Sequence, residues 1–225
     1  MRHTSDTPAN FDLFADDQPK ITGNEQIGPQ SFVLRSFALP LIESLLPALR
    51  KVVRQAPFRH LVTPGGFTMS AAMTCCGSVG WTSSRQGYRY SPLDPQSGLP
   101  WPRIPEDLMA LASSAAEAAG FPGFIADACL INRYVPGAKM SLHQDKDEAD
   151  HHWPVVSISL GIAAIFEFGG FERSDKPQRV SLFHGDVVVW GGVDRLRFHG
   201  VQPIKQASHP LLGEQRINLT LRKAL

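Results

Sequence analysis

After residue 126, short runs of β-branched or aromatic residues alternate with turn residues along the rest of the chain. The runs are ACLINRYV, VVSISLG, AIFEFGG, RVSLFHG, DVVVWGG, LRFHGV and RINLTLR. Short runs at such regular spacing are typical of strands in an all-β sandwich or barrel. We therefore predict that residues 126–225 form a β-structured core.

Two segments of the N-terminal half have helical patterns. Residues 39–55 place apolar side chains on one helical face: Leu41, Leu45, Leu49 and Val52. Residues 105–120 are rich in alanine, with acidic side chains in the first turn and Gly120 where a C-cap belongs. Two helices beside many short strands predict a mainly β protein with flanking helices (α+β).

The segments between these elements are rich in turn-forming residues. Residues 1–30 are predicted to be an irregular N-terminal segment, and residues 32–37 a short strand. Residues 62–102 carry large side chains among Gly, Pro, Ser and Thr: Phe67, Met69, Met73, Trp81, Tyr88, Tyr90 and Trp101. These side chains form either a recognition surface or the filling of a set of hairpins, and composition does not choose between the two.

Length and charge narrow the class of protein. The chain has 225 residues, of which 43% are hydrophobic and 19% charged, as in an ordinary globular domain. We predict a single domain over residues 31–225. A net charge of +1 argues against a protein that coats nucleic acid electrostatically. Binding to nucleic acid would therefore require a local patch and a specific pocket.

Cysteine usage and the N-terminal sequence favour the cytoplasm. Cys75, Cys76 and Cys129 include no CxxC spacing, which argues against a zinc site, and an odd number leaves one unpaired. The first twenty residues are polar and acidic, without the apolar stretch of a signal peptide. No apolar run approaches transmembrane length. We expect a cytoplasmic protein that does not interact with a membrane.

A first candidate for chemistry is the H-x-D sequence formed by His143 and Asp145. On an extended backbone these two side chains point to the same side and can reach one ion. A distant second histidine would complete a 2-His-1-carboxylate triad, which leaves positions on Fe(II) open for a co-substrate and oxygen. Alone, H-x-D is a weak signal.

The candidates for the third ligand are His184, His199 and His209. The adjacent pair His151–His152 lies too close to Asp145 in sequence and is predicted to be part of a loop. His199 lies within a predicted strand, whereas His184 ends one and His209 precedes a proline. Because a rigid element holds a ligand best, we favour His199.

The last predicted strand, residues 216–222, alternates strictly between polar and apolar residues. Its polar face carries Arg216, Asn218, Thr220 and Arg222. Two guanidiniums on one face suit a small dicarboxylate, because arginine binds carboxylates with two donors. The alternative is an exposed strand with solvated arginines. A second polar face is offered by Asn132 and Tyr134 in another strand.

Several long segments resemble the AlkB family of alkylation-repair dioxygenases. They are PFRHLVTPGGFTMS, GWTSSRQGYRYSPLDPQSGLPWP, DACLINRYVPGAKMSLHQDKDE, GDVVVWGG and RINLTLR. These segments contain the H-x-D sequence and an R-x5-R sequence, and a later histidine accompanies them. The resemblance implies a double-stranded β-helix (jelly roll) core over residues 126–225. Residues 31–125 would supply the helices and a nucleotide-recognition lid.

The resemblance also implies the cofactors and the residues that bind them. Iron, as Fe(II), would be held by His143, Asp145 and His199. The co-substrate 2-oxoglutarate would be bound by Arg216 and Arg222, assisted by Asn132, Tyr134 and Asn218. O2 would be the oxidant. Base and phosphate contacts would come from Met73, Trp81, Tyr88, Asp147 and Arg173.

The implied reaction is oxidative demethylation of N-alkylated bases such as 1-methyladenine and 3-methylcytosine, releasing formaldehyde, succinate and CO2. The implied substrate is alkylated single- or double-stranded DNA, with RNA as an alternative, acted on by a monomer. Two other functions compete with this one. One is a related dioxygenase that acts on a protein or a small molecule. The other is a jelly roll whose metal ion is only structural.

Overall fold

The structure is a computed structural model that describes residues 23–225. Its first half contains nine elements: β1 (Gly23–Gly28), β2 (Ser31–Arg35), η1 (Leu39–Leu41), α1 (Ile42–Gln55), β3 (Arg59–Val62), β4 (Thr68–Gly77), β5 (Gly80–Ser84), β6 (Gly87–Ser91) and α2 (Glu106–Ala118). The second half contains β7 (Ala128–Tyr134), β8 (Met140–His143), β9 (Val155–Gly161), β10 (Ala164–Phe168), β11 (Gln178–Leu182), β12 (Val187–Trp190), η2 (Gly192–Asp194), β13 (His199–Val201) and β14 (Arg216–Arg222).

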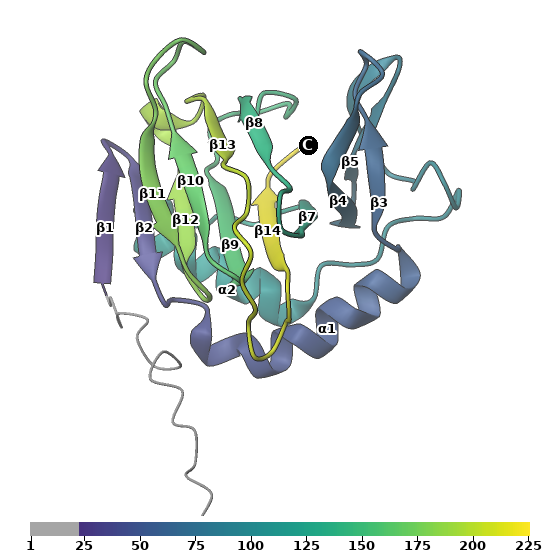
Figure 1. Cartoon of the computed structure of the whole chain (residues 1–225), viewed down its shortest axis with the longest axis horizontal. Helices are drawn as coiled ribbons and strands as arrows, with labels where there is room; N and C mark the ends of the chain where they lie inside the picture. The colour runs from purple at the N-terminus through teal and green to yellow at the C-terminus, as the bar shows by residue number, and fades with distance from the viewer. Residues whose placement is uncertain (1–22) are drawn as a thin grey trace, which may run out of the picture.

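Two antiparallel sheets face each other and form the core (Figure 1). The larger has eight strands in the order β1-β2-β12-β9-β14-β7-β4-β3, and the smaller has four in the order β11-β10-β13-β8. The hairpin β5–β6 forms a separate two-stranded sheet. This arrangement confirms the predicted mainly β fold and agrees with a jelly-roll core.

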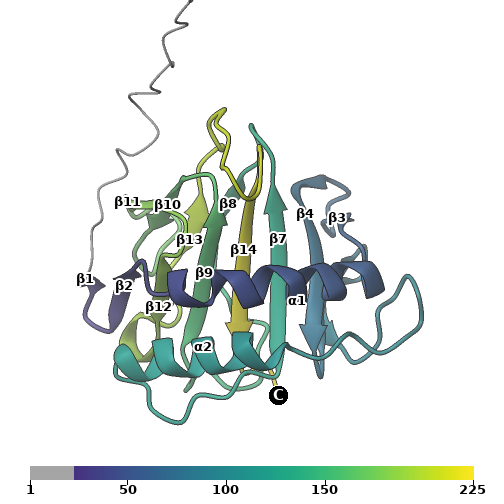
Figure 2. The same ribbon diagram turned by 90° about the horizontal axis from the view of Figure 1, so that it is seen from below.

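Both helices lie across the outer face of the eight-stranded sheet, as Figure 2 shows. Helix α1 buries Ile42, Leu45, Leu49 and Val52, which confirms the predicted apolar face except that Leu41 is only partly buried. Their side chains pack with those of α2 and with the apolar face of the sheet in one hydrophobic cluster. The helices therefore close one side of the sheet and leave its other face to the smaller sheet.

The alternation of β14 decides what lies between the two sheets. Ile217, Leu219 and Leu221 belong to the cluster beneath the helices. The polar residues of β14 point the other way, and both of its arginines are buried. The alternative of solvated arginines on an exposed strand is therefore wrong. The space between the sheets holds charged groups that need partners.

Two sequence-based expectations need correction. The irregular N-terminal segment was expected to reach residue 30, but residues 23–28 form β1 and pair with β2. Most of β1 is exposed, so backbone pairing rather than an apolar pattern makes it a strand. Residues 1–22 lie outside the described part of the chain. Strand β8 was not among the predicted runs, since only its backbone pairing with β13 defines it.

The N-terminal and C-terminal parts of the chain share one sheet. Strands β2, β3 and β4 pair into the same eight strands as β7, β9, β12 and β14. Residues 31–125 thus contribute core strands as well as helices and hairpins. Within residues 23–225, no helix is both long and apolar enough to cross a membrane.

Candidate active site

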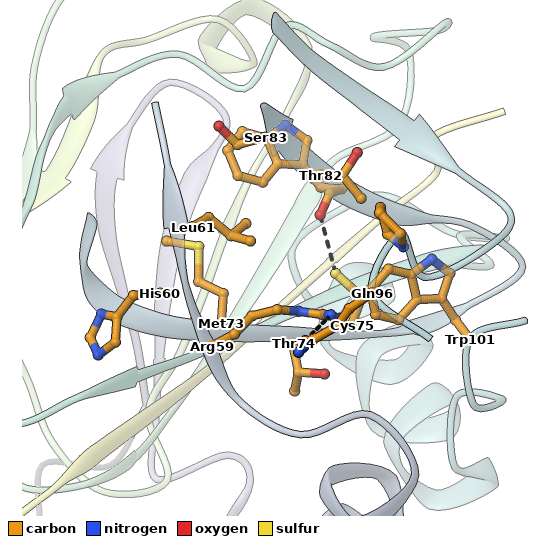
Figure 3. Close-up of a pocket in the computed structure, with 12 residues that line it drawn as sticks. Arg59, His60, Leu61, Met73, Thr74, Cys75, Thr82, Ser83, Gln96 and Trp101 are labelled. Carbon is orange, nitrogen blue, oxygen red and sulfur yellow. Dashed lines mark hydrogen bonds between the residues drawn. The ribbon is translucent and has the colours of Figure 1, made fainter. Parts of the chain in front are cut away.

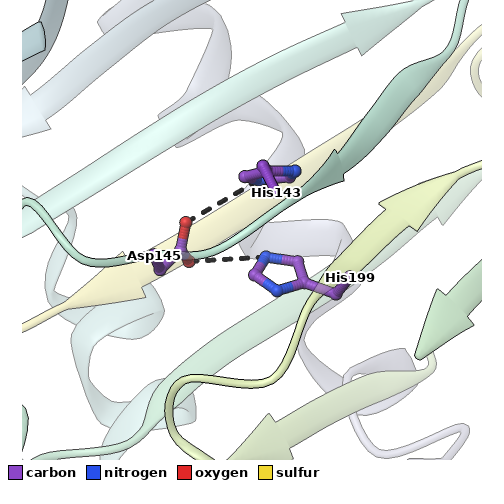
Figure 4. A group of neighbouring side chains, drawn as sticks. All are labelled: His143, Asp145 and His199. Atoms are coloured by element: carbon purple, nitrogen blue, oxygen red, sulfur yellow. Dashed lines mark ion pairs between the residues drawn. The ribbon is translucent and has the colours of Figure 1, made fainter. Parts of the chain in front are cut away.

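Three potential metal ligands converge where β8 and β13 pair. His143 ends β8, His199 begins β13, and the two are direct partners in the register of these strands. Asp145 follows two residues after His143. One ligand atom from each of the three side chains lies within 4.8 Å of the others. Figure 4 shows the carboxylate facing both imidazole rings. The strand pairing thus brings together residues that lie 54 to 56 positions apart in sequence.

The charges around these side chains favour metal-binding protonation states. Burial lowers the pKa of His199 to about 3, with the neighbouring His143 contributing next, so its imidazole is neutral at pH 7. Burial alone would raise the pKa of Asp145. The positive charge of Arg222, with smaller electrostatic contributions from the two nearby imidazoles, outweighs burial and holds this pKa below its usual value. The carboxylate is therefore ionised and able to bind a cation.

A buried network of charges holds Asp145 in place. Nε and Nη2 of Arg222 lie 2.8 and 2.7 Å from Oδ2 of Asp145. Arg195 donates from Nη1 to the backbone carbonyl of Asp145 at 2.7 Å, and from Nη2 to Glu148 at 3.0 Å. Two arginines thus face two carboxylates, which is the compensation that buried charges require.

Arg216 occupies the opposite end of β14 from Arg222. Its Nη2 donates to Ser159 Oγ at 2.9 Å, and its guanidinium lies 5.2 Å from the centre of the Tyr134 ring. Nε and Nη1 of this arginine are buried without a partner. Burial lowers the pKa of Arg216, the sign of a positive charge that is poorly compensated. A carboxylate bound beside this guanidinium would supply the missing negative charge and accept from one of these donors.

The other residues expected to bind the co-substrate line the same interior. Asn132 and Asn218 are cross-strand partners on β7 and β14, and Asn132 Nδ2 donates to Asn218 Oδ1 at 3.3 Å. Oδ1 of Asn132 is buried without a partner. Tyr134 is directly opposite Arg216 in the register of the same strands. The structure thus gathers all of the expected co-substrate residues on two adjacent strands.

A cavity of about 790 Å³ opens over the metal-ligand candidates. Its lining includes all five of the expected substrate residues: Met73, Trp81, Tyr88, Asp147 and Arg173. Arg222, His143 and Asp145 line it as well. The predicted iron site and the predicted base site therefore share one space.

The large side chains at this cavity include both buried and exposed residues, so neither a pure recognition surface nor a pure core filling describes them. Trp81 stacks on Tyr88 with ring centres 5.1 Å apart, and it donates its indole N–H to Asp147 Oδ2 at 2.8 Å. Tyr88 is 44% exposed, whereas Met73 is buried. Because Tyr88 covers one face of the indole, a flat ligand can stack only on the other face unless Tyr88 moves. Arg173 lies on an exposed loop, with its guanidinium above Phe198.

A second cavity, of about 390 Å³, lies on the other side of Trp81 and Met73 (Figure 3). Its wall includes Arg59, which stacks against Trp101 and pairs with Asp94 at 2.6 Å. Those partners already satisfy its charged group. No metal-ligand candidate lines this cavity.

The other histidines considered from sequence lie away from the triad. His184 and His209 stack on each other with ring centres 4.2 Å apart. Nδ1 of His184 accepts the backbone N–H of Gly161, which leaves no lone pair at that atom for a metal. His151 and His152 lie outside any strand, as predicted. The choice of His199 therefore agrees with the geometry.

Sequence reasoning missed Glu148, Arg195 and Tyr90. Glu148 lies only three residues after Asp145, in a segment whose charges looked like an ordinary solvated loop. Arg195 is buried and reaches Asp145 across 50 positions of sequence, a contact that no local pattern reveals. Tyr90 was noted only as one aromatic residue among several.

Comparisons with known proteins agree with this site. Residues 34–222 match the 2OG-Fe(II) oxygenase superfamily. The chain is 55% identical over 214 residues to the alpha-ketoglutarate-dependent dioxygenase AlkB of Escherichia coli, covering 95% of this chain and 98% of that protein. Alpha-ketoglutarate is another name for 2-oxoglutarate.

More distant proteins extend the comparison. The DNA N(6)-methyladenine demethylase ALKBH1C of Arabidopsis thaliana is 35% identical over 161 residues, which is 60% of this chain and 35% of that protein. The solved structure of OsALKBH1 is similar with a TM-score of 0.77 and 29% identity, over 89% of this chain and all of that one.

Proposed function

Because this chain belongs to the AlkB family of the 2OG-Fe(II) oxygenase superfamily, we propose that it removes alkyl groups from nucleic-acid bases by oxidative demethylation. It is a 2-oxoglutarate-dependent dioxygenase that uses Fe(II), 2-oxoglutarate and O2. The observation that carries the proposal is the cavity lined both by His143 and Asp145 of the His-Asp-His cluster and by the stacked pair Trp81 and Tyr88. The alternative of a jelly roll whose metal ion is only structural does not account for membership of an oxygenase superfamily.

The donor set fits an iron site. Two histidines and one carboxylate are the ligands of non-haem Fe(II) oxygenases. We propose that His143, Asp145 and His199 hold the iron. When bound, the iron supplies oxidation of the alkyl group at the expense of O2 and 2-oxoglutarate, with release of formaldehyde, succinate and CO2. Arg222 and Arg195 orient Asp145 for this role.

The unpaired donors of Arg216 fit the distal carboxylate of 2-oxoglutarate. Nε and Nη1 face different sides of the guanidinium, and a carboxylate bound on either side would accept from a donor that now has no partner. We propose that Asn132, Tyr134 and Asn218 complete this site. Arg222 would bind 2-oxoglutarate at the end of the site that lies near the metal ligands. The burial of both arginines keeps water away from the bound co-substrate.

The entrance of the cavity fits a flipped, positively charged base. We propose that the base stacks on Trp81, which contributes about 1–3 kcal/mol. Tyr88 and Arg173 lie at the exposed rim, where a phosphate would pass. Trp81 donates only to Oδ2 of Asp147, which leaves Oδ1 free. The negative charge of this carboxylate would therefore attract a cationic lesion. A neutral, undamaged base gains less from that charge, and a damaged base is extruded more easily.

The form and location of the enzyme are also proposals. We propose that it acts as a monomer. All three cysteines are unpaired and buried, which supports a reducing compartment such as the cytoplasm. The alkylated strand is DNA, single- or double-stranded, and RNA offers the same base chemistry.

The proposal is tested by loading the protein anaerobically with Fe(II) and 2-oxoglutarate and then adding O2 with an oligonucleotide that contains 1-methyladenine. We expect the oligonucleotide to lose the mass of one methylene group as succinate and formaldehyde appear. Asp147→Asn should slow turnover of this cationic lesion more than that of a neutral one. Succinate release without any change in the mass of DNA or RNA oligonucleotides would favour a protein or small-molecule substrate instead.

A further inference from the structure

Two side-chain hydrogen bonds join the hairpin β5–β6 to the loop that follows β8. Trp81 in β5 donates to Oδ2 of Asp147 at 2.8 Å. Tyr90 in β6 donates its hydroxyl to Oε1 of Glu148 at 2.6 Å. These acceptors are consecutive residues, two and three positions after Asp145. The hairpin that presents the base-stacking surface is thus attached directly to the loop of a metal ligand.

Glu148 shares a guanidinium with that ligand. Its side chain is 2% exposed, and Oε2 accepts from Arg195 at 3.0 Å. Oε1 lies 3.4 Å from Nε of Arg222, the same nitrogen that donates to Asp145 at 2.8 Å. Arg222 therefore lies between two carboxylates. How strongly Arg222 binds each carboxylate depends on how far other hydrogen-bond donors neutralise the charge of that carboxylate.

Tyr90 supplies the hydroxyl group that donates to Glu148. Its ring is half-buried against Val79, Ala128 and Ala224. Burial raises the pKa of Tyr90 well above its ordinary value, so the hydroxyl keeps its proton and donates it. Without that donor, Oε1 of Glu148 would attract Arg222 more strongly and draw the guanidinium away from Asp145.

We propose that Tyr90 is a positioning residue that connects the base-binding hairpin to Asp145 through Glu148 and Arg222. A base that stacks on Trp81 shifts the hairpin, and the Tyr90–Glu148 hydrogen bond transmits the shift to the guanidinium that holds the metal ligand. The metal site thereby responds to the presence of a base. This inference rests on the proposed function, since it requires that a base bind beside Trp81.

The test uses Co(II) in place of iron, because its visible absorption bands report the arrangement of ligands without turnover. The full chain is loaded with Co(II) and 2-oxoglutarate and titrated with a single-stranded oligonucleotide that contains one 1-methyladenine. The wild-type spectrum should change on binding. In Tyr90→Phe the spectrum without oligonucleotide should already differ from wild type, because Arg222 is drawn toward Glu148. The change on binding should shrink by at least about threefold, while the affinity measured by fluorescence anisotropy stays close to wild type.

Thr82→Val is the matched control. It removes a hydrogen bond within the same hairpin, from Thr82 Oγ1 to the carbonyl of Arg89, and it does not touch the loop after β8. This variant should keep the wild-type spectral change. If Tyr90 acts through Glu148, then adding Tyr90→Phe to Glu148→Gln should have little further effect.

The outcomes separate this inference from the proposed function. A spectral change of wild-type size in Tyr90→Phe, or one reduced equally in Thr82→Val, would overturn the role of Tyr90. A wild-type protein that binds the oligonucleotide without any spectral change would overturn it as well. No binding of the methylated oligonucleotide to the wild-type protein would contradict the proposed function, and with it this inference.

Discussion

Each of the three metal-ligand candidates supplies one of the protein's bonds to the ion. His199→Ala should therefore abolish turnover and Co(II) binding while leaving the fold largely intact, and His143→Ala and Asp145→Ala should do the same. His184→Ala and His209→Ala are the matched controls, because those rings stack on each other away from the triad. Their activity should stay within a few-fold of wild type. An active His199→Ala beside an inactive His184→Ala would contradict the assignment.

Arg216 and Arg222 differ in their partners, and their lysine variants should differ accordingly. Arg216→Lys keeps a charge but loses the planar guanidinium, two of whose donors have no partner in the structure. Loss of hydrogen bonds to a charged group costs about 1.5–3 kcal/mol, so the 2-oxoglutarate KM should rise about 10- to 150-fold.

Arg222→Lys should weaken Co(II) binding as well, because Arg222 holds Asp145. Arg179→Lys, on the exposed face of β11, should change neither constant. An unchanged KM in Arg216→Lys would place the co-substrate away from the N-terminal end of β14.

Trp81 offers a test of base stacking against core packing. Trp81→Ala should reduce turnover of a methylated oligonucleotide by an amount that corresponds to about 1–3 kcal/mol. It should largely spare the 2-oxoglutarate decarboxylation that occurs without substrate. Truncation of a core tryptophan would instead cost about 3–5 kcal/mol of stability. Measuring both reactions and the thermal midpoint separates the two, since equal losses with a sharply lowered midpoint would identify Trp81 as core.

At the scale of elements, the junction of β9 and β14 determines where Arg216 lies. Gly161 ends β9 with a φ of +93°, and a Cβ there would come within 2.3 Å of the carbonyl oxygen of Gln215. Gln215 immediately precedes Arg216. Gly161→Ala should therefore lower the thermal midpoint and raise the 2-oxoglutarate KM, because the start of β14 must move.

Gly213→Ala is the control for backbone strain alone. Gly213 has a φ of +66°, but a Cβ there would meet nothing within 4 Å. This variant should lose about 1 kcal/mol of stability from the left-handed backbone and keep the wild-type KM. Equal KM values in the two variants would show that the junction does not position Arg216.

At the scale of the whole molecule, His184 makes stability depend on pH. Burial, followed by the nearby His209, lowers the pKa of His184 from 6.5 to about 4. Between these two values the unfolded chain binds a proton that the folded protein does not. Stability should therefore be fully present above pH 6.5 and fall as the pH is lowered toward 4.

Thermal midpoints at pH 7 and pH 4.5 test this dependence. His184 is partly exposed, so its contribution is on the order of 1 kcal/mol, or about 2–4 °C for a domain of this size. His184→Asn keeps an acceptor for the N–H of Gly161 and should lose less stability between the two pH values. The same loss in both proteins would assign the pH dependence to other groups.

The sequence by itself determined the features that depend on neighbours along the chain. Alternation in RINLTLR placed the arginines opposite the leucines of β14, and a 3.6-residue repeat placed the buried face of α1. Both follow because backbone geometry sets which side chains share a face. The H-x-D spacing and the predicted strand around His199 indicated the metal triad, and the position of His199 beside His143 agrees with it. The family resemblance added the identity of the metal and the co-substrate.

Only the tertiary structure decided the features that depend on distant contacts. Strand β1 has an exposed, polar sequence and exists because β2 pairs with it. Within residues 62–102, Met73 is buried because β4 belongs to the eight-stranded sheet, whereas Tyr88 is exposed in the separate hairpin β5–β6. The links from Tyr90 to Glu148 and from Arg195 to Asp145 span 58 and 50 positions. The local sequence around a charged or aromatic residue is the same whether or not a distant residue contacts it. Its burial and its partners are therefore set only when the two sheets pack together.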